Sequence, residues 1–235
     1  MNIENAVVLI TGSNRGLGLV FAQEALKRGA KKVYAAARNP ETVTLEGVIP
    51  VKLDVNSPED IARVVKECGD VTLLINNAGI AETGGILGDD VEASLRRQME
   101  TNVYAPMKLA TAFAPVLAAN NGGGIINVAS VASWINLPIL AAYSVTKAAV
   151  WSVSNAMRHE LVEQKTQVLT LHVGFIETDL TKGFDVDKVS PETVVANTYN
   201  ALEAGENQVL ADEAAKQVHQ ALSTYPDIYL HAIKS

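Results

Sequence analysis

The sequence has one cysteine, Cys68, so an intrachain disulfide is excluded. No apolar run reaches the roughly 18 residues that a membrane-spanning helix needs. Basic runs are also missing and the formal net charge is −7, which argues against nucleic acid or an anionic membrane surface as a partner. Residues 1–5 lack the basic region of a secretory signal. We therefore expect a soluble, cytoplasmic protein.

The chain also lacks a Pro-, Gly- or Ser-rich linker, a low-complexity segment and an internal repeat. Its 235 residues are enough for one large domain with a substantial core. We predict that residues 1–235 form a single domain that binds both a dinucleotide and a substrate.

Apolar strands alternate with helical patterns along the chain. Continuous apolar runs predict strands at residues 6–10, 32–37, 48–53, 71–75, 124–128, 167–173 and 207–210. The longest helices are expected at residues 92–119, with possible kinks at Pro106 and Pro115, and from 141 to about 163. This alternation predicts an α/β fold of Rossmann type, a doubly wound parallel sheet with helices on both faces. Ligands of such folds bind beyond the carboxyl ends of the strands.

Three glycines, Gly12, Gly16 and Gly18, lie between the first strand and the first helix. Small residues let the backbone approach a pyrophosphate, and a helix N-terminus offers free amides and a positive dipole end. The spacing GxxxGxG differs from the commoner GxGxxG, and tight packing of helix on strand is the alternative interpretation. Their position directly after the first strand favours a dinucleotide site.

The second predicted strand ends in three alanines and Arg38, with no acid where the ribose hydroxyl of NAD would be bound. Arg38, together with Arg15 in the glycine turn, can bind a 2′-phosphate through its guanidinium. We therefore predict NADP(H) rather than NAD(H) as the cofactor. The alternative for Arg38 is a solvated loop charge.

Tyr143 and Lys147 are four residues apart in a predicted helix, so they lie on the same face. A nearby ammonium favours the phenolate and lowers the pKa of a tyrosine from about 10. Such a tyrosine is suited to general acid–base catalysis. The alternative is a lysine that merely packs over a tyrosine ring.

Taken together, residues 11–18, Asp54, residues 76–79, Asn102, Ser130, Tyr143 and Lys147 resemble the short-chain dehydrogenase/reductase family in order and spacing. The resemblance implies that Tyr143 donates a proton in carbonyl reduction and accepts one in alcohol oxidation. Lys147 would hold the nicotinamide ribose, and Ser130 would hydrogen-bond the substrate oxygen. Asn102 would anchor a water that links Lys147 to solvent, the alternative being an amide bonded to backbone. Ser133 is the nearest rival of Ser130, but its spacing does not match the family.

The same resemblance implies a set of cofactor contacts. They are Gly12, Ser13, Asn14, Arg15, Gly16, Leu17, Gly18, Arg38, Asp54, Val55, Asn77, Ala78, Gly79, Tyr143, Lys147, Gly174, Ile176 and Thr178. Asp54 would meet the adenine amine, and residues 77–79 would run along the adenine ribose. Val173 and Gly174 stand where the family usually has Pro-Gly, a departure that affects the backbone near the nicotinamide.

The expected substrate pocket is apolar and contains no Arg or Lys. Its expected lining is Val131, Trp134, Ile135, Leu137, Phe175 and Leu180. We therefore expect hydride transfer between NADP(H) and a neutral, fairly hydrophobic ketone, aldehyde or secondary alcohol. The short connection at residues 179–190 predicts an open site. The alternatives are a non-catalytic NADP-binding regulator of the same fold and a dehydratase or epimerase.

Family members commonly pair two apolar helices into a four-helix interface. The predicted helices around residues 107–117 and 141–163 are apolar on several faces, so we expect a homodimer or homotetramer. The aromatic segment at residues 225–230 could pack on the body or on a second subunit. His159 and His172 lack metal-ligand spacing, so structural roles and no metal site are expected.

Overall fold

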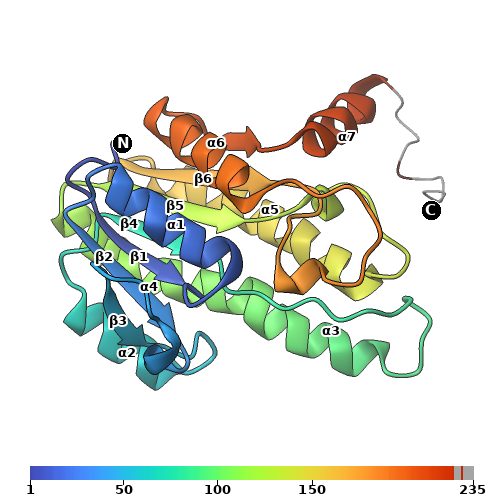
Figure 1. The fold of residues 1–235 in the computed structure, drawn as a ribbon, viewed down its shortest axis with the longest axis horizontal. Coiled ribbons are helices and arrows are strands. Elements are labelled where there is room, and N and C mark those ends of the chain that lie inside the picture. The colour runs from blue at the N-terminus through green and yellow to red at the C-terminus, as the bar shows by residue number, and fades with distance from the viewer. Residues whose placement is uncertain (225–228, 230–235) are drawn as a thin grey trace.

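The computed structural model describes residues 1–224 and 229 and has a parallel sheet of seven strands at its centre (Figure 1). The strands are β1 (Val7–Thr11), β2 (Lys32–Ala37), β3 (Ile49–Lys52), β4 (Leu73–Asn76), β5 (Gly123–Val128), β6 (Thr166–His172) and β7 (Gln208–Leu210). Their order in the sheet is β3-β2-β1-β4-β5-β6-β7, and every neighbouring pair is parallel. The predicted doubly wound α/β fold is confirmed.

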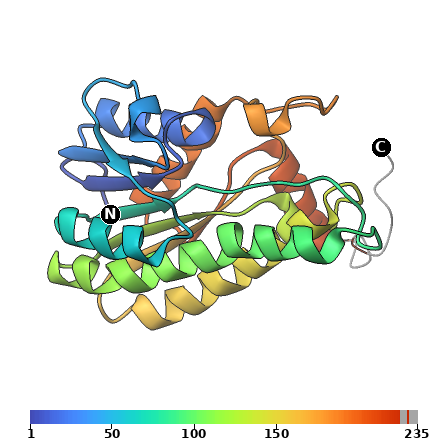
Figure 2. The same ribbon diagram turned by 90° about the horizontal axis from the view of Figure 1, so that it is seen from below.

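Helices cover both faces of the sheet (Figure 2). Helices α1 (Gly16–Lys27) and α6 (Pro191–Glu203) pack on one face. Helices α2 (Pro58–Glu67), α4 (Ala105–Ala119) and α5 (Ala141–Leu161) pack on the other. All residues of β1 and β4 are buried, as the continuous apolar runs predicted for central strands. Helix α7 (Glu213–Thr224) follows β7.

The single helix expected at residues 92–119 is wrong in one respect. The structure has α3 (Val91–Met99) and α4 joined by a π-helical turn at Glu100–Tyr104. The change therefore lies at this turn and not at the prolines, since Pro106 lies in the first turn of α4 and Pro115 is accommodated inside it. A π turn inserts an extra residue into a helix and often occurs at functional sites.

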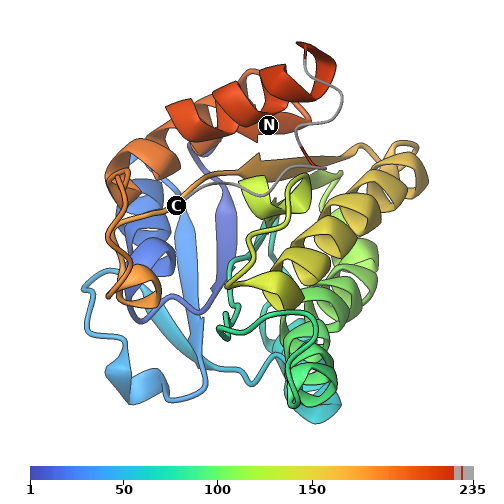
Figure 3. The same cartoon turned by 90° about the vertical axis from the view of Figure 1, so that its right-hand side faces the viewer.

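The carboxyl ends of the strands lie along one edge of the sheet. Figure 3 shows the molecule from the side toward which these ends point. Strand β1 lies between β2 and β4, so the connections that follow β1 and β4 go to opposite sides of the sheet. Such a switch point leaves a crevice between the two sets of connections. The segment at residues 225–230, predicted to pack on the body or on a second subunit, lies outside the described residues except for Tyr229.

None of the helices in the described part of the chain is both long enough and apolar enough to cross a bilayer. Over the same residues, His, Cys, Asp and Glu side chains form no group that could hold a metal ion.

Candidate active site

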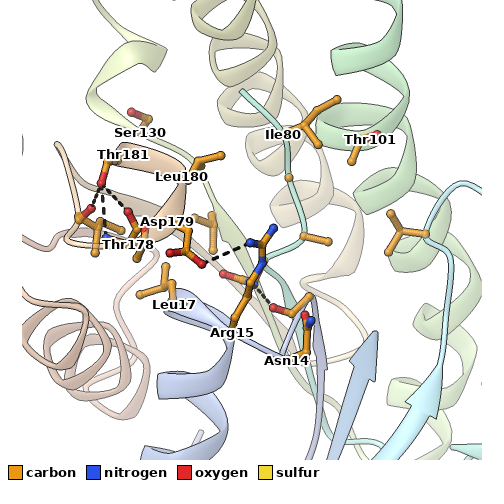
Figure 4. Close-up of a pocket in the computed structure, with 18 of the residues that line it drawn as sticks. Asn14, Arg15, Leu17, Ile80, Thr101, Ser130, Thr178, Asp179, Leu180 and Thr181 are labelled. Carbon is orange, nitrogen blue, oxygen red and sulfur yellow. Dashed lines mark hydrogen bonds and ion pairs between the residues drawn. The ribbon is translucent and has the colours of Figure 1, made fainter. Parts of the chain in front are cut away.

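A cleft of about 490 Å³ opens beyond the carboxyl ends of the strands (Figure 4). The structure brings most of the predicted site residues to its wall. These are Gly12, Asn14, Arg15, Gly16, Leu17, Arg38, Asp54, Val55, Asn77, Ala78, Gly79, Ser130, Tyr143, Lys147, Gly174, Ile176 and Thr178. A cleft of this volume is in the usual range for cofactor sites.

The glycine turn gives one wall of the cleft free backbone amides. Gly12 and Gly16 have positive φ angles of 65° and 54°, which glycine adopts without strain. Helix α1 begins at Gly16 without a capping side chain and without an acid in its first turn. Its first amides and its positive dipole end are therefore available to an anion.

Ser13 and Gly18 do not line the cleft, and their contact with the cofactor stays a prediction. The Ser13 hydroxyl is buried and donates to the carbonyl of Ala36 at 3.2 Å. A Cβ at Gly18 would lie 2.2 Å from the carbonyl oxygen of Gly12. The two residues shape the turn from behind, and for Gly18 the close packing of helix on strand is the better interpretation.

The side chain of Asn77 ties the segment after β4 to the glycine turn. Its amide donates to the carbonyls of Thr11 at 2.9 Å and Gly12 at 3.2 Å. The Thr11 hydroxyl in turn accepts from the backbone amides of Asn77 and Ala78, each at 3.0 Å. These bonds fix the floor of the cleft between the two neighbouring strands.

The opposite wall contains a short 3-10 helix, Asp179–Thr181, which follows Thr178. The Thr181 hydroxyl donates to the carbonyls of Ile176 and Thr178. Arg15 Nη1 lies 3.3 Å from Asp179 Oδ2, so the predicted phosphate ligand has a partner on the facing wall (Figure 4). The sequence analysis missed Asp179 and Thr181 as cleft residues, although they directly follow Thr178.

Ser130, Tyr143 and Lys147 all line the cleft. The Lys147 ammonium donates to the carbonyl of Val128 at 2.7 Å and lies 5.4 Å from the centroid of the Tyr143 ring. The Ser130 hydroxyl accepts from the amide of Ala132 at 3.1 Å. Strand β5 and helix α5 therefore place two hydroxyls and one ammonium together.

The expected lowering of the Tyr143 pKa is not found. Burial raises the pKa of Tyr143 to about 12, and a hydrogen bond with the Ser130 side chain opposes this shift. Burial also lowers the pKa of Lys147 to about 8. Lys147 is buried and Tyr143 is half-buried, and the loss of contact with water disfavours the charged form of each. The phenol is therefore protonated at neutral pH.

Asn102 lies in the π turn and does not line the cleft. Its side-chain oxygen accepts from the amide of Ile80 at 2.9 Å, and its nitrogen donates to the Ile80 carbonyl at 2.9 Å and to Thr146 Oγ1 at 3.0 Å. This agrees with the alternative of an amide bonded to backbone. The interaction also connects the segment after β4 to the residue before Lys147, a link that no sequence pattern predicted.

A second, smaller pocket of about 240 Å³ adjoins the cleft. Val131, Leu137, Phe175 and Leu180 line it as predicted, together with Ala81, Thr83, Ser130, Leu140, Tyr143, Gly174, Thr181, Lys182 and Phe184. Trp134 and Ile135 do not line it, and the expected absence of a Lys is contradicted by Lys182. The Trp134 ring instead stacks on His172 at a centroid distance of 4.0 Å. Ser133 is buried and lines neither cavity.

The cleft and the pocket share part of their walls. Ser130, Tyr143, Gly174, Leu180 and Thr181 line both cavities. Ser130 and Tyr143 are thus at the boundary between the cleft, which contains the glycine turn and two arginines, and the smaller pocket. A proton donor at this boundary can reach a ligand bound in the pocket. A second ligand bound in the cleft would contact the first at the same place.

His172, at the end of β6, lies behind this boundary. Its Nδ1 is 3.1 Å from the carbonyl oxygen of Ser130, so Nδ1 carries the hydrogen. Nε2 has no hydrogen-bond partner among the described residues. Burial lowers the pKa of His172 to about 4. The neutral ring supports the backbone of Ser130, a structural role.

Comparison with known proteins gives consistent matches. The family model for short chain dehydrogenase matches residues 6–188. A crystal structure of a short chain dehydrogenase from Burkholderia cenocepacia in complex with NADP has a TM-score of 0.93 and 34% identity, and the match covers 97% of this chain and 96% of that one.

Two curated relatives extend this comparison. An NADP-dependent 3-hydroxy acid dehydrogenase of Schizosaccharomyces pombe is 30% identical over 246 aligned positions, which cover 93% of this chain and 95% of that protein. Oxidoreductase BOA17 of Botryotinia fuckeliana is 35% identical over 181 residues, which cover 72% of this chain and 65% of that protein.

Proposed function

We propose, from the premise that the chain belongs to the short-chain dehydrogenase/reductase family, that it transfers a hydride between NADP(H) and a neutral, fairly hydrophobic ketone, aldehyde or secondary alcohol. The observation that carries the proposal is the position of Ser130 and Tyr143 on the wall shared by the cleft and the pocket. A dinucleotide bound in the cleft and a carbonyl compound bound in the pocket would meet at these hydroxyls.

The cleft fits NADP(H) by its donor groups. The free amides at the start of α1 suit a pyrophosphate, and Arg15 and Arg38 are cations for a 2′-phosphate. No carboxylate stands directly after β2, where Arg38 and Asn39 follow Ala37, to repel that phosphate. NADP is also the ligand of the Burkholderia structure and the cofactor in the name of the yeast relative.

When bound, NADPH supplies the hydride for carbonyl reduction. The chain supplies the proton, because the Tyr143 phenol with its pKa of about 12 is protonated at neutral pH. Ser130 donates a hydrogen bond to the substrate oxygen as negative charge develops there. Lys147, whose pKa of about 8 keeps it mostly charged at neutral pH, favours the phenolate that remains. In alcohol oxidation this phenolate accepts the proton.

Asn102 has a supporting role in the proposal. Its hydrogen bonds join Ile80, on the wall of the cleft, to Thr146 on α5. Thr146 is the residue before Lys147. A water anchored near Asn102 would pass protons between Lys147 and solvent. In this role Asn102 positions the lysine rather than touching the substrate.

Exposed apolar residues support a homodimer or homotetramer. Tyr104 and Met107 on the π turn and α4, and Val145 on α5, are 39%, 38% and 39% exposed. Met107 and Val145 belong to the two helices whose apolar faces predicted a four-helix interface, and Tyr104 lies in the π turn before α4. Light scattering after size-exclusion chromatography tests this, and a monomer at micromolar concentration would contradict it. A cytoplasmic location stays a prediction.

The function is tested by NADPH consumption against a panel of ketones, aldehydes and quinones, with NADH in parallel. We expect turnover of apolar carbonyl compounds with a preference for NADPH. Tight binding of NADPH without turnover of any carbonyl or alcohol would contradict the proposal. That result would favour the alternative, a non-catalytic NADP-binding regulator of the same fold.

A further inference from the structure

An ion pair joins the two walls of the cofactor cleft. Arg15 precedes α1 on one wall, and Asp179 opens the 3-10 helix on the other. Both residues line the cleft, and Arg15 Nη1 lies 3.3 Å from Asp179 Oδ2 (Figure 4). The side chains are 72% and 66% exposed, so the pair lies on the solvent side of the cleft. It connects residues that are 164 positions apart in the chain.

In this ion pair, Asp179 binds the guanidinium of Arg15, which is a candidate ligand of the 2′-phosphate. The second candidate, Arg38, forms no ion pair with any residue that the structure describes. A phosphate that enters the cleft would therefore meet one uncompensated guanidinium and one whose charge is neutralised by a carboxylate. Because an exposed ion pair is only weakly favourable, Arg15 can exchange its partner at low cost.

We propose that Asp179 is a specificity-determining residue for the cofactor, since its carboxylate competes with the 2′-phosphate for Arg15 and so reduces the preference for NADP(H) over NAD(H). The inference rests on the proposed binding of NADP(H) in the cleft. Both cofactors contain a pyrophosphate, and the carboxylate of Asp179 repels it equally in NADP(H) and NAD(H). Only NADP(H) has the further phosphate that competes for the guanidinium.

The experiment measures the Kd of NADPH and of NADH by cofactor fluorescence in wild type and Asp179→Asn. Asp185→Asn is the matched control, because Asp185 is an exposed carboxylate of the same segment that lines neither cavity. We expect Asp179→Asn to lower the Kd of NADPH about three- to fivefold and to change that of NADH less than about twofold. Asp185→Asn changes neither value by more than about 1.5-fold on the same reasoning.

A double variant isolates the competition for Arg15. In the background of Arg15→Gln, Asp179→Asn no longer favours NADPH over NADH if the two side chains act through each other. Equal tightening of both cofactors, or no change in either, would overturn the inference. Failure of the wild-type protein to bind NADPH would instead overturn the proposed function. Thermal unfolding of each variant verifies that these exposed substitutions leave the fold intact.

Discussion

Outside the wall that they share, the cleft and the pocket are lined largely by different parts of the fold. The cleft is lined by residues at the ends of hydrogen-bonded parallel strands and by the start of α1. The pocket is lined largely by connections between elements, at residues 81–83, 137–140 and 180–184. A strand ladder fixes the cleft, whereas loops can change the pocket without disturbing the sheet.

The fixed geometry of the cleft predicts the largest effect on stability. Gly18→Ala would place a Cβ 2.2 Å from the carbonyl oxygen of Gly12, a contact with backbone that cannot move freely. We expect a loss of about 3 kcal/mol in the free energy of unfolding, measured by urea denaturation, together with weaker NADPH binding.

Gly85→Ala is the control for this substitution, because a Cβ at Gly85 meets nothing within 4 Å. It lies in a connection near the pocket and should leave both stability and cofactor binding almost unchanged. Equal stability of the Gly18 and Gly85 variants would break the distinction between a rigid cleft and an adaptable pocket.

His172 supports the boundary between the two cavities and predicts a pH effect on stability. Its pKa falls from 6.5 to about 4 on folding, so the unfolded chain takes up a proton between these values while the folded protein does not. The free energy of unfolding should therefore decrease as the pH falls from about 6.5 to 4, by about 2–3 kcal/mol from this group. Urea denaturation at several pH values measures the slope.

The variant His172→Gln has no titrating ring and should lose most of this slope. It keeps an amide N–H that can donate to Ser130. An unchanged pH dependence of stability in the variant would show that other groups cause the acid sensitivity.

Arg38 tests the role of positive charge in the cleft. Arg38→Ala should raise the Kd of NADPH at least about tenfold and that of NADH less than about threefold, because a charged hydrogen bond to phosphate is lost in one cofactor only. Arg96→Ala, on the surface of α3, is the control. Equal losses for both cofactors would mean that the 2′-phosphate is bound elsewhere.

Phe175 tests the apolar character of the pocket. Its ring lies 5.5 Å from that of Phe184. Phe175→Ala should raise the KM for apolar ketones about fivefold through lost apolar contact, while the Kd of NADPH changes little. Val162→Ala, at an exposed position of the C-terminal end of α5, is the control. A larger change in the Kd of NADPH than in the KM for ketones would indicate that Phe175 contacts the cofactor rather than the ketone.

Most residues of the cleft could be predicted from the sequence because the cleft is built at the ends of parallel strands, which also make it rigid. Continuous apolar runs locate the strands, and parallel pairing brings their ends to one edge. Residues after β1, β2, β3 and β4 could therefore be assigned to one site before any distance was known. The sequence did not show that Gly18 faces the strand rather than the cleft, because the motif is compatible with both.

The pocket was predicted less well because its residues come from loops. Spacing alone could not show that Trp134 turns to stack on His172, or that Lys182 reaches the pocket. The pKa of Tyr143 was also misjudged, since burial of a side chain cannot be read from its helical spacing to Lys147. These errors share one cause: they depend on packing between segments that are distant in the chain.

The central claim is that the Tyr143 phenol donates the proton at the boundary of the two cavities. It is tested most directly by Tyr143→Phe, with turnover of a carbonyl substrate and the Kd of NADPH measured on the same preparation. Tyr104→Phe, at an exposed tyrosine, is the control. We predict that turnover falls by roughly 10²- to 10⁴-fold while the Kd of NADPH stays within about twofold. Turnover within a few-fold of wild type would contradict the account.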